Sequence, residues 1–142
     1  MTTLGRQLRD NAVALISLVV ALGSLGYNTW RNERTEHNRN VRTAAFELLM
    51  RLGELERVAF LAHYERDPAG GNLRVGWTYI AAIHDLSELV PAPVPAQAEQ
   101  LKAVWGESSD ALGSDDEAAI NRIDEAIDKL RRSTLGMLQA LR

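Results

Sequence analysis

The chain has 142 residues, which suits one domain and a short additional segment. Its formal net charge is −3, so no overall basic field indicates nucleic acid as a partner. It contains no cysteine, which excludes disulfide bonds and thiolate metal sites without selecting a compartment.

The first element is an uncharged, mostly apolar run over residues 11–30. About 20 residues of helix span about 30 Å, close to the hydrocarbon thickness of a bilayer. The run therefore predicts a transmembrane helix over 11–30, preceded by an N-terminal tail over 1–10. At its C-terminal end lie aromatic residues suited to the membrane interface, followed at once by arginines. The predicted membrane-interface residues are Tyr27, Trp30, Arg31 and Arg34.

Two alternatives compete with this interpretation. A buried core helix would normally carry charges on one face, and this run carries none. In a cleavable signal peptide, Arg6 and Arg9 would form the basic region and Ala21-Leu22-Gly23 the cleavage site. The apolar run continues beyond that site to Trp30, which argues against cleavage.

The flanking arginines bear on the orientation of the span. Arg6 and Arg9 precede it, and four arginines follow closely: Arg31, Arg34, Arg39 and Arg42. The positive-inside rule favours a cytoplasmic C-terminal domain. Because long domains can cross a membrane regardless of flanking charge, a periplasmic location stays open.

Small and polar residues recur along the span at steps of 3, 4, 3 and 4: Ala14, Ser17, Ala21, Ser24 and Asn28. This spacing places them on one stripe of a helix, where small side chains allow another helix to approach closely. We expect a helix-packing face. The alternatives are that small residues are common in membrane helices anyway and that Asn28 is hydrated near the interface.

The soluble part begins with residues 31–40, which are polar on every side and predict a solvated stalk that continues the anchor helix. From residue 41 a heptad pattern begins, and residues 41–142 predict a four-helix bundle, regular or irregular. The expected fold is therefore all-α: one N-terminal transmembrane helix followed by a four-helix bundle.

In the first bundle helix, Phe46, Leu49 and Phe60 are expected to widen a buried heptad seam. Pro68 predicts that this helix ends near Asp67. The seam comprises Val41, Ala45, Leu48, Leu52, Leu55, Ala59 and Ala62.

The second and third helices are expected over 73–90 and 96–112, joined by the stiff Pro-rich segment 91–95. That segment is interpreted as a spacer, with a proline-rich docking site as the alternative. A break is expected near Gly106. The expected inward residues are Trp77, Ile80, Ile83, Leu86, Val90, Leu101, Val104, Trp105 and Leu112.

The last helix is expected over 115–141, with Ser114 as N-cap and Glu117 completing a capping box. Its inward residues follow heptad steps: Ile120, Ile123, Ile127, Leu130, Thr134, Met137 and Leu141.

No catalytic, cofactor-binding or metal-binding residue is predicted. Of the three histidines, His37 lies on the polar stalk, while His63 and His84 have acidic neighbours. The Glu-x-x-His pairs of two-metal bundles do not occur, and neither do a Gly-x-Ser-x-Gly element or a phosphate-binding loop. We therefore expect no enzyme activity.

The junction YNTWRNERTEHNR, residues 27–39, resembles small bacterial single-pass membrane proteins, in which an apolar helix ends in Trp and runs into an Arg/Glu/His/Asn-rich stretch. That group is largely uncharacterised, so the resemblance implies a location in the bacterial inner membrane and no reaction.

Together these features predict a non-catalytic, membrane-anchored interaction protein: an accessory subunit or scaffold of a larger membrane complex. Its partners would be bilayer lipids and other membrane-protein subunits, or a second copy of itself. A homo-oligomer formed through the heptad seams and a ligand-binding sensor are the alternatives.

Overall fold

The computed structural model describes residues 11–114 and 116–141, so the predicted tail over 1–10 lies outside it. The described residues form four α-helices and no strand, which confirms the all-α class. The helices are α2 (Ala12–Phe60), α3 (Leu73–Ser87), α4 (Val94–Ser108) and α5 (Glu117–Ala140). Contacts divide the chain after His37 into two units.

A membrane helix followed by a separate four-helix bundle is not what the structure contains. The expected first bundle helix is the C-terminal part of α2, a single helix of 49 residues that begins within the apolar run. Residues 31–40 continue the helix, as expected, because no proline or glycine interrupts them. The hydroxyls of Thr35 and Thr43 donate to carbonyls four residues earlier, so they stay within the helical geometry.

The end of α2 lies where Pro68 predicted it. A π-helical turn, Leu61–Glu65, follows the α-helix, and Arg66 then adopts the left-handed conformation with φ of 49°. Asp67 Oδ1 accepts a hydrogen bond from Ala69 N and so stabilises the turn. A Cβ on Gly71 would lie 2.4 Å from Ala62 N, so the returning chain requires glycine there.

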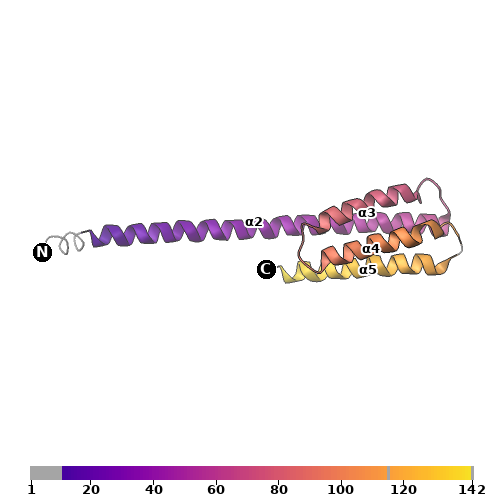
Figure 1. Cartoon of the computed structure of the whole chain (residues 1–142). Helices are drawn as coiled ribbons and strands as arrows, with labels where there is room; N and C mark the ends of the chain where they lie inside the picture. Colours follow the sequence, from indigo (N-terminus) through magenta and orange to yellow (C-terminus); the bar gives the residue numbers. More distant parts are fainter. Residues whose placement is uncertain (1–10, 115, 142) are drawn as a thin grey trace. The chain divides into compact units, whose positions relative to one another are not determined.

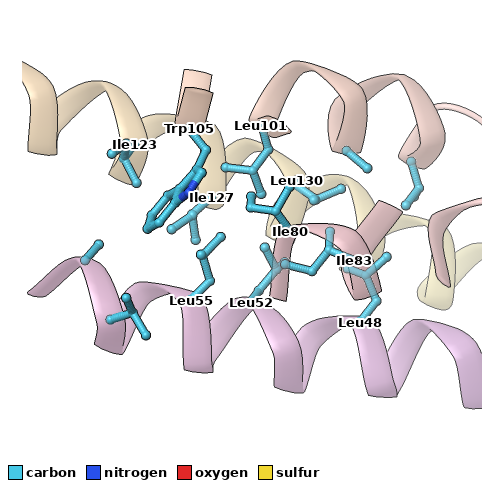
Figure 2. Close-up of a cluster of buried hydrophobic side chains, with 14 of the residues drawn as sticks. Leu48, Leu52, Leu55, Ile80, Ile83, Leu101, Trp105, Ile123, Ile127 and Leu130 are labelled. Atoms are coloured by element: carbon cyan, nitrogen blue, oxygen red, sulfur yellow. The ribbon is translucent and has the colours of Figure 1, made fainter. Parts of the chain in front are cut away.

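In the C-terminal unit, α3, α4 and α5 lie beside the C-terminal part of α2 (Figure 1). Leucines of α2 meet Ile80 and Ile83 of α3, Leu101 and Trp105 of α4, and isoleucines of α5 in one apolar core (Figure 2). All seven seam residues expected in the first helix are buried, and so are six of the seven in the last, with Leu141 partly buried. The heptad predictions are therefore confirmed almost completely.

Trp105 has no exposed surface, which confirms its core position. A Cβ on Gly76 would lie 2.1 Å from Trp105 Cζ2, so α3 approaches the indole too closely for any side chain at position 76. Trp77 does not fit the prediction, because it is 43% exposed and lies over Gly106 instead. The Gly-Trp pair of α3 and the Trp-Gly pair of α4 thus pack against each other with one indole inside and one at the surface.

The prediction for Phe46 and Phe60 is wrong, since they are 59% and 49% exposed. Each follows a buried seam residue, Val41 or Leu55, by five positions, which turns it about 140° away from the core. Leu49 is only partly buried. The covered stripe of α2 is therefore narrower than the sequence suggested.

The N-cap of the last helix is also different from the prediction. Asp116 caps α5, because its Oδ1 accepts hydrogen bonds from Ala118 N at 3.0 Å and Ala119 N at 3.3 Å. Ser114 instead donates to Ala111 O, 2.6 Å away, within the preceding turn. Serine and aspartate are both good N-caps, so the path of this turn determines which of the two caps α5.

The middle helices differ from the prediction at their ends. Helix α3 ends at Ser87, earlier than expected, and α4 begins at Val94 with Pro95 in its first turn. The expected break near Gly106 lies after Ser108, where the 3₁₀ turn Ser109–Ala111 begins.

Candidate functional site

The apolar part of α2 has no interior of its own. Side chains from Val13 to His37 are all exposed, and none of the most apolar 18-residue window, with mean hydropathy 1.7, is buried in the chain. The described residues thus contain one helix long and apolar enough to cross a membrane. A core helix of a soluble protein would be mostly buried, whereas a signal sequence near an N-terminus meets the same criteria.

The five residues of the expected packing face all lie on α2 and are exposed: Ala14, Ser17, Ala21, Ser24 and Asn28. Ser17 Oγ donates a hydrogen bond to Val13 O at 2.8 Å, within the same helix. The hydroxyl proton is therefore already satisfied, and Ser17 offers a neighbouring helix mainly its small size.

The expected membrane-interface residues form a real cluster at the end of the apolar run. The rings of Tyr27 and Trp30 have centroids 6.3 Å apart, and Arg34 Cζ lies 5.5 Å from the Trp30 ring centroid. This is a cation–π arrangement, which orients the guanidinium along the helix surface. Arg31 follows Tyr27 by one turn and lies on the same face.

A second apolar stripe, missed in the sequence, lies on the exposed side of α2 in the C-terminal unit. We call it the outer seam, and it comprises Phe46, Met50, Gly53, Arg57, Phe60 and Tyr64. Its steps of 4, 3, 4, 3 and 4 repeat the heptad of the buried seam, displaced by five residues. Met50 is 66% exposed and Tyr64 53%. The heptad steps from Phe46 to Tyr64 are the signal in the sequence that reveals this stripe.

Helix α5 extends the outer seam at one side. Arg131 of α5 binds Glu56 of α2, and Arg42 Nη2 donates to Leu141 O at 2.8 Å, so α5 lies along this edge of α2. Leu135, one turn after Arg131, is 43% exposed. Large exposed apolar residues gathered on one face are typical of an interaction surface.

Charged groups line the same edge between α2 and α5. Burial raises the pKa of Asp124, and the negative charges of Glu56 and Asp128 raise it further, while His63 and Arg131 act in the opposite direction. Arg131 Nη1 also donates to Asp128 Oδ1 at 2.7 Å. Arg131 thus pairs with Glu56 of α2 and Asp128 of α5 and joins the two helices.

His63 and His84 each lie beside a polar group of another element. His63 is buried and its Nδ1 lies 3.2 Å from Leu112 O, so the ring links the π-helical turn after α2 to the turn before α5. His84 Nε2 lies 3.3 Å from Glu99 Oε2, and its Nδ1 lies 3.6 Å from Asp85 Oδ1. In the described ranges, no three His, Asp or Glu side chains are grouped so as to hold a metal ion.

The C-terminal unit has a surface hollow of 270 Å³ beside Arg66 and Leu73 and another of 220 Å³ beside Trp77 and His84. Pockets for small organic ligands usually measure about 300–1,000 Å³ and enclose most of the ligand. These hollows therefore give no support to the sensor alternative.

No protein-family model, no curated protein and no solved structure matches this chain.

Proposed function

We propose that this chain is a non-catalytic protein anchored in the bacterial inner membrane by the N-terminal part of α2, acting as an accessory subunit or scaffold of a larger membrane complex. In this proposal the anchor crosses the bilayer once, and the C-terminal unit faces the cytoplasm and contacts other subunits.

The observation that carries the proposal is the complete exposure of the apolar run. Val19 and Leu25 are 68% and 66% exposed, and no other element among residues 11–114 and 116–141 covers the window around them. Leaving so many large apolar side chains in water is costly, because each gains about 1.5–3 kcal/mol when it is fully buried. A bilayer supplies the missing apolar environment, and the uncharged length fits it.

Membrane fractionation tests the anchor. We expect the full-length chain to sediment with membranes after a high-salt wash and to be released only by detergent. Intact-mass analysis of the same material distinguishes an anchor from a cleaved signal, since cleavage at Ala21-Leu22-Gly23 would remove the first part of the run. Uncleaved chain in the supernatant without detergent would overturn the proposal.

The packing face can be tested by adding bulk to it. We expect the Ser17→Leu/Ala21→Leu variant to lose its membrane partners in co-purification from mild detergent, because larger side chains keep a neighbouring helix away. The matched control is Val19→Leu/Gly23→Leu, which has the same spacing and lies about 160° around the helix. Equal co-purification by both variants counts against the packing face.

The topology can be tested because the chain has no cysteine. Glu107 is exposed on α4, so a Glu107→Cys variant carries one accessible thiol. With a cytoplasmic C-terminal unit, a membrane-impermeant maleimide should label this thiol only after the cells are opened. Labelling in cells with an intact inner membrane and a permeabilised outer membrane would place the unit in the periplasm.

The outer seam supports a second candidate, a homo-oligomer. The seams first expected to pair between chains are buried within one chain, but the outer seam has heptad spacing and is open. A seam of this kind can pair with its own copy in a parallel coiled coil. Oxidation of a Met50→Cys variant in membranes should then yield a disulfide-linked dimer, whereas Glu107→Cys should not. A monomer in both cases excludes the candidate.

A further inference from the structure

One face of α2 carries Tyr27, Trp30, Arg31 and Arg34, and both of the charged residues in this set are arginines. The four residues follow one another at i, i+3, i+4 and i+7, so they lie on one side of α2. Glu33 follows Trp30 by three positions and borders this face, about 120° from Tyr27, whereas Glu36 lies about 180° from Tyr27. The N-terminal unit thus has a face with two cations and two aromatic rings, bordered by one carboxylate.

These cations are available to an external anion. Among the residues that the structure describes, no carboxylate lies within ion-pair distance of Arg31 or Arg34. Arg34 is held over the exposed Trp30 ring at 5.5 Å, and Trp30 is in turn beside Tyr27. This stacking restricts the guanidinium before any ligand arrives, which lowers the entropy cost of binding.

We infer that Trp30, Arg31 and Arg34 bind the phosphate of an anionic phospholipid headgroup, with Tyr27 packing against the adjoining lipid. Guanidinium groups bind phosphate through paired N–H donors, and the Trp indole N–H adds a further donor. The cluster lies where the apolar run ends, which is the depth of the headgroups when α2 crosses a bilayer. The inference rests on the proposed membrane anchoring.

Charge selects the kind of lipid. A zwitterionic phosphatidylcholine headgroup also has a phosphate, but its choline cation cancels the net charge. Each basic side chain close to an anionic lipid surface strengthens association by about fivefold. Two arginines should therefore favour phosphatidylglycerol over phosphatidylcholine by roughly 25-fold.

Spin-labelled lipids test this preference on the full-length chain reconstituted in phosphatidylcholine vesicles. The fraction of motionally restricted phosphatidylglycerol label, relative to phosphatidylcholine label, gives the selectivity. We expect Arg31→Gln/Arg34→Gln to bring the ratio close to one. The matched control is Arg57→Gln/Arg74→Gln, which removes two exposed arginines of the C-terminal unit and should keep the ratio.

Each outcome has a distinct meaning. A ratio near one for the unmodified chain in vesicles, or an equal loss in both double variants, overturns the lipid site while the anchor stands. Failure of the chain to enter vesicles at all overturns the anchor together with the site. Loss of the preference on adding inorganic phosphate, but not chloride of equal ionic strength, assigns the face to soluble phosphate and overturns the lipid inference.

Discussion

Leu18 and Leu22 are 55% and 60% exposed, whereas Leu48 and Leu52 are fully buried, although all four lie on the same helix. The helical backbone and the residue type are identical in the two regions. The difference is that α3, α4 and α5 supply apolar neighbours for the second pair, and none of the residues that the structure describes supplies them for the first. Hydrogen bonds within α2 form in both regions, so the surroundings of each region decide what its apolar side chains contribute.

The largest effect is expected at the centre of the C-terminal core. Trp105→Ala should lower the free energy of unfolding by about 3–5 kcal/mol, because it leaves a cavity between α3, α4 and α5. Trp77→Ala, which removes a half-exposed indole, is the control and should cost clearly less. Urea unfolding of the full-length chain in detergent, followed by circular dichroism, measures both. Equal losses would mean that the two indoles are not divided between core and surface.

Membrane insertion of the N-terminal part of α2 should be sensitive to an added charge and not to a change in side-chain volume. Val19→Asp should oppose membrane insertion by about 2.5–3.5 kcal/mol and move the chain toward the soluble fraction. Val19→Leu keeps the hydropathy and should leave fractionation unchanged. Retention of Val19→Asp in the membrane, with the same yield as the unmodified chain, would show that this region is not the anchor.

Two glycines on helices sharpen the contrast between covered and open surface. Gly76→Ala should cost about 1–3 kcal/mol, because its Cβ would overlap the Trp105 ring. Gly53→Ala should stabilise the helix by up to about 1 kcal/mol, because the Cβ meets nothing within 4 Å. Thermal unfolding of the two variants checks the opposite signs. A loss at Gly53 would indicate that the outer seam is already occupied, as in a dimer.

The start of α5 offers a smaller effect. Asp116→Ala should cost about 1 kcal/mol by leaving the first amides of α5 without an acceptor. Asp116→Asn retains a capping oxygen and should cost only a small part of this. Equal losses of stability in the two variants would mean that the charge of Asp116 stabilises α5 and that its hydrogen bonds do not.

The smallest expected effect is a pH dependence at Asp124. Its folded-state pKa is raised above the ordinary aspartate value of 3.8, so the folded chain holds the proton more tightly than the unfolded chain. The contribution of Asp124 to the free energy of unfolding is fully present below pH 3.8 and is lost as the pH rises through the raised pKa. Asp124→Asn should remove that loss and so stabilise the chain at neutral pH. Denaturant midpoints across this pH range, compared with an Asp110→Asn control in the turn before α5, measure the effect. An Asp124→Asn variant whose stability varies with pH as in the unmodified chain would contradict the prediction.

Periodicity predicted much of this architecture. The heptad steps of Val41 to Ala62 and of Ile120 to Met137 identified the buried stripes of α2 and α5 correctly. The apolar run and Pro68 gave the beginning of α2 and the place where it ends. The stripe of Ala14 and the cluster at Trp30 were also visible in the sequence, since residues on one helix need no tertiary contacts to share a face.

Local spacing predicts which segments are helical and where each residue lies around its helix, although not where α3 ends or where α4 begins and ends. Which faces are covered depends on how the helices pack against one another. Phe46 and Phe60 look like core residues until the positions of α3 and α5 leave them outside, and Trp77 and Trp105 are distinguished only by how α3 packs on α4. Asp116 caps α5 for the same reason: the path of the preceding turn, set by distant contacts, chooses between two capable side chains.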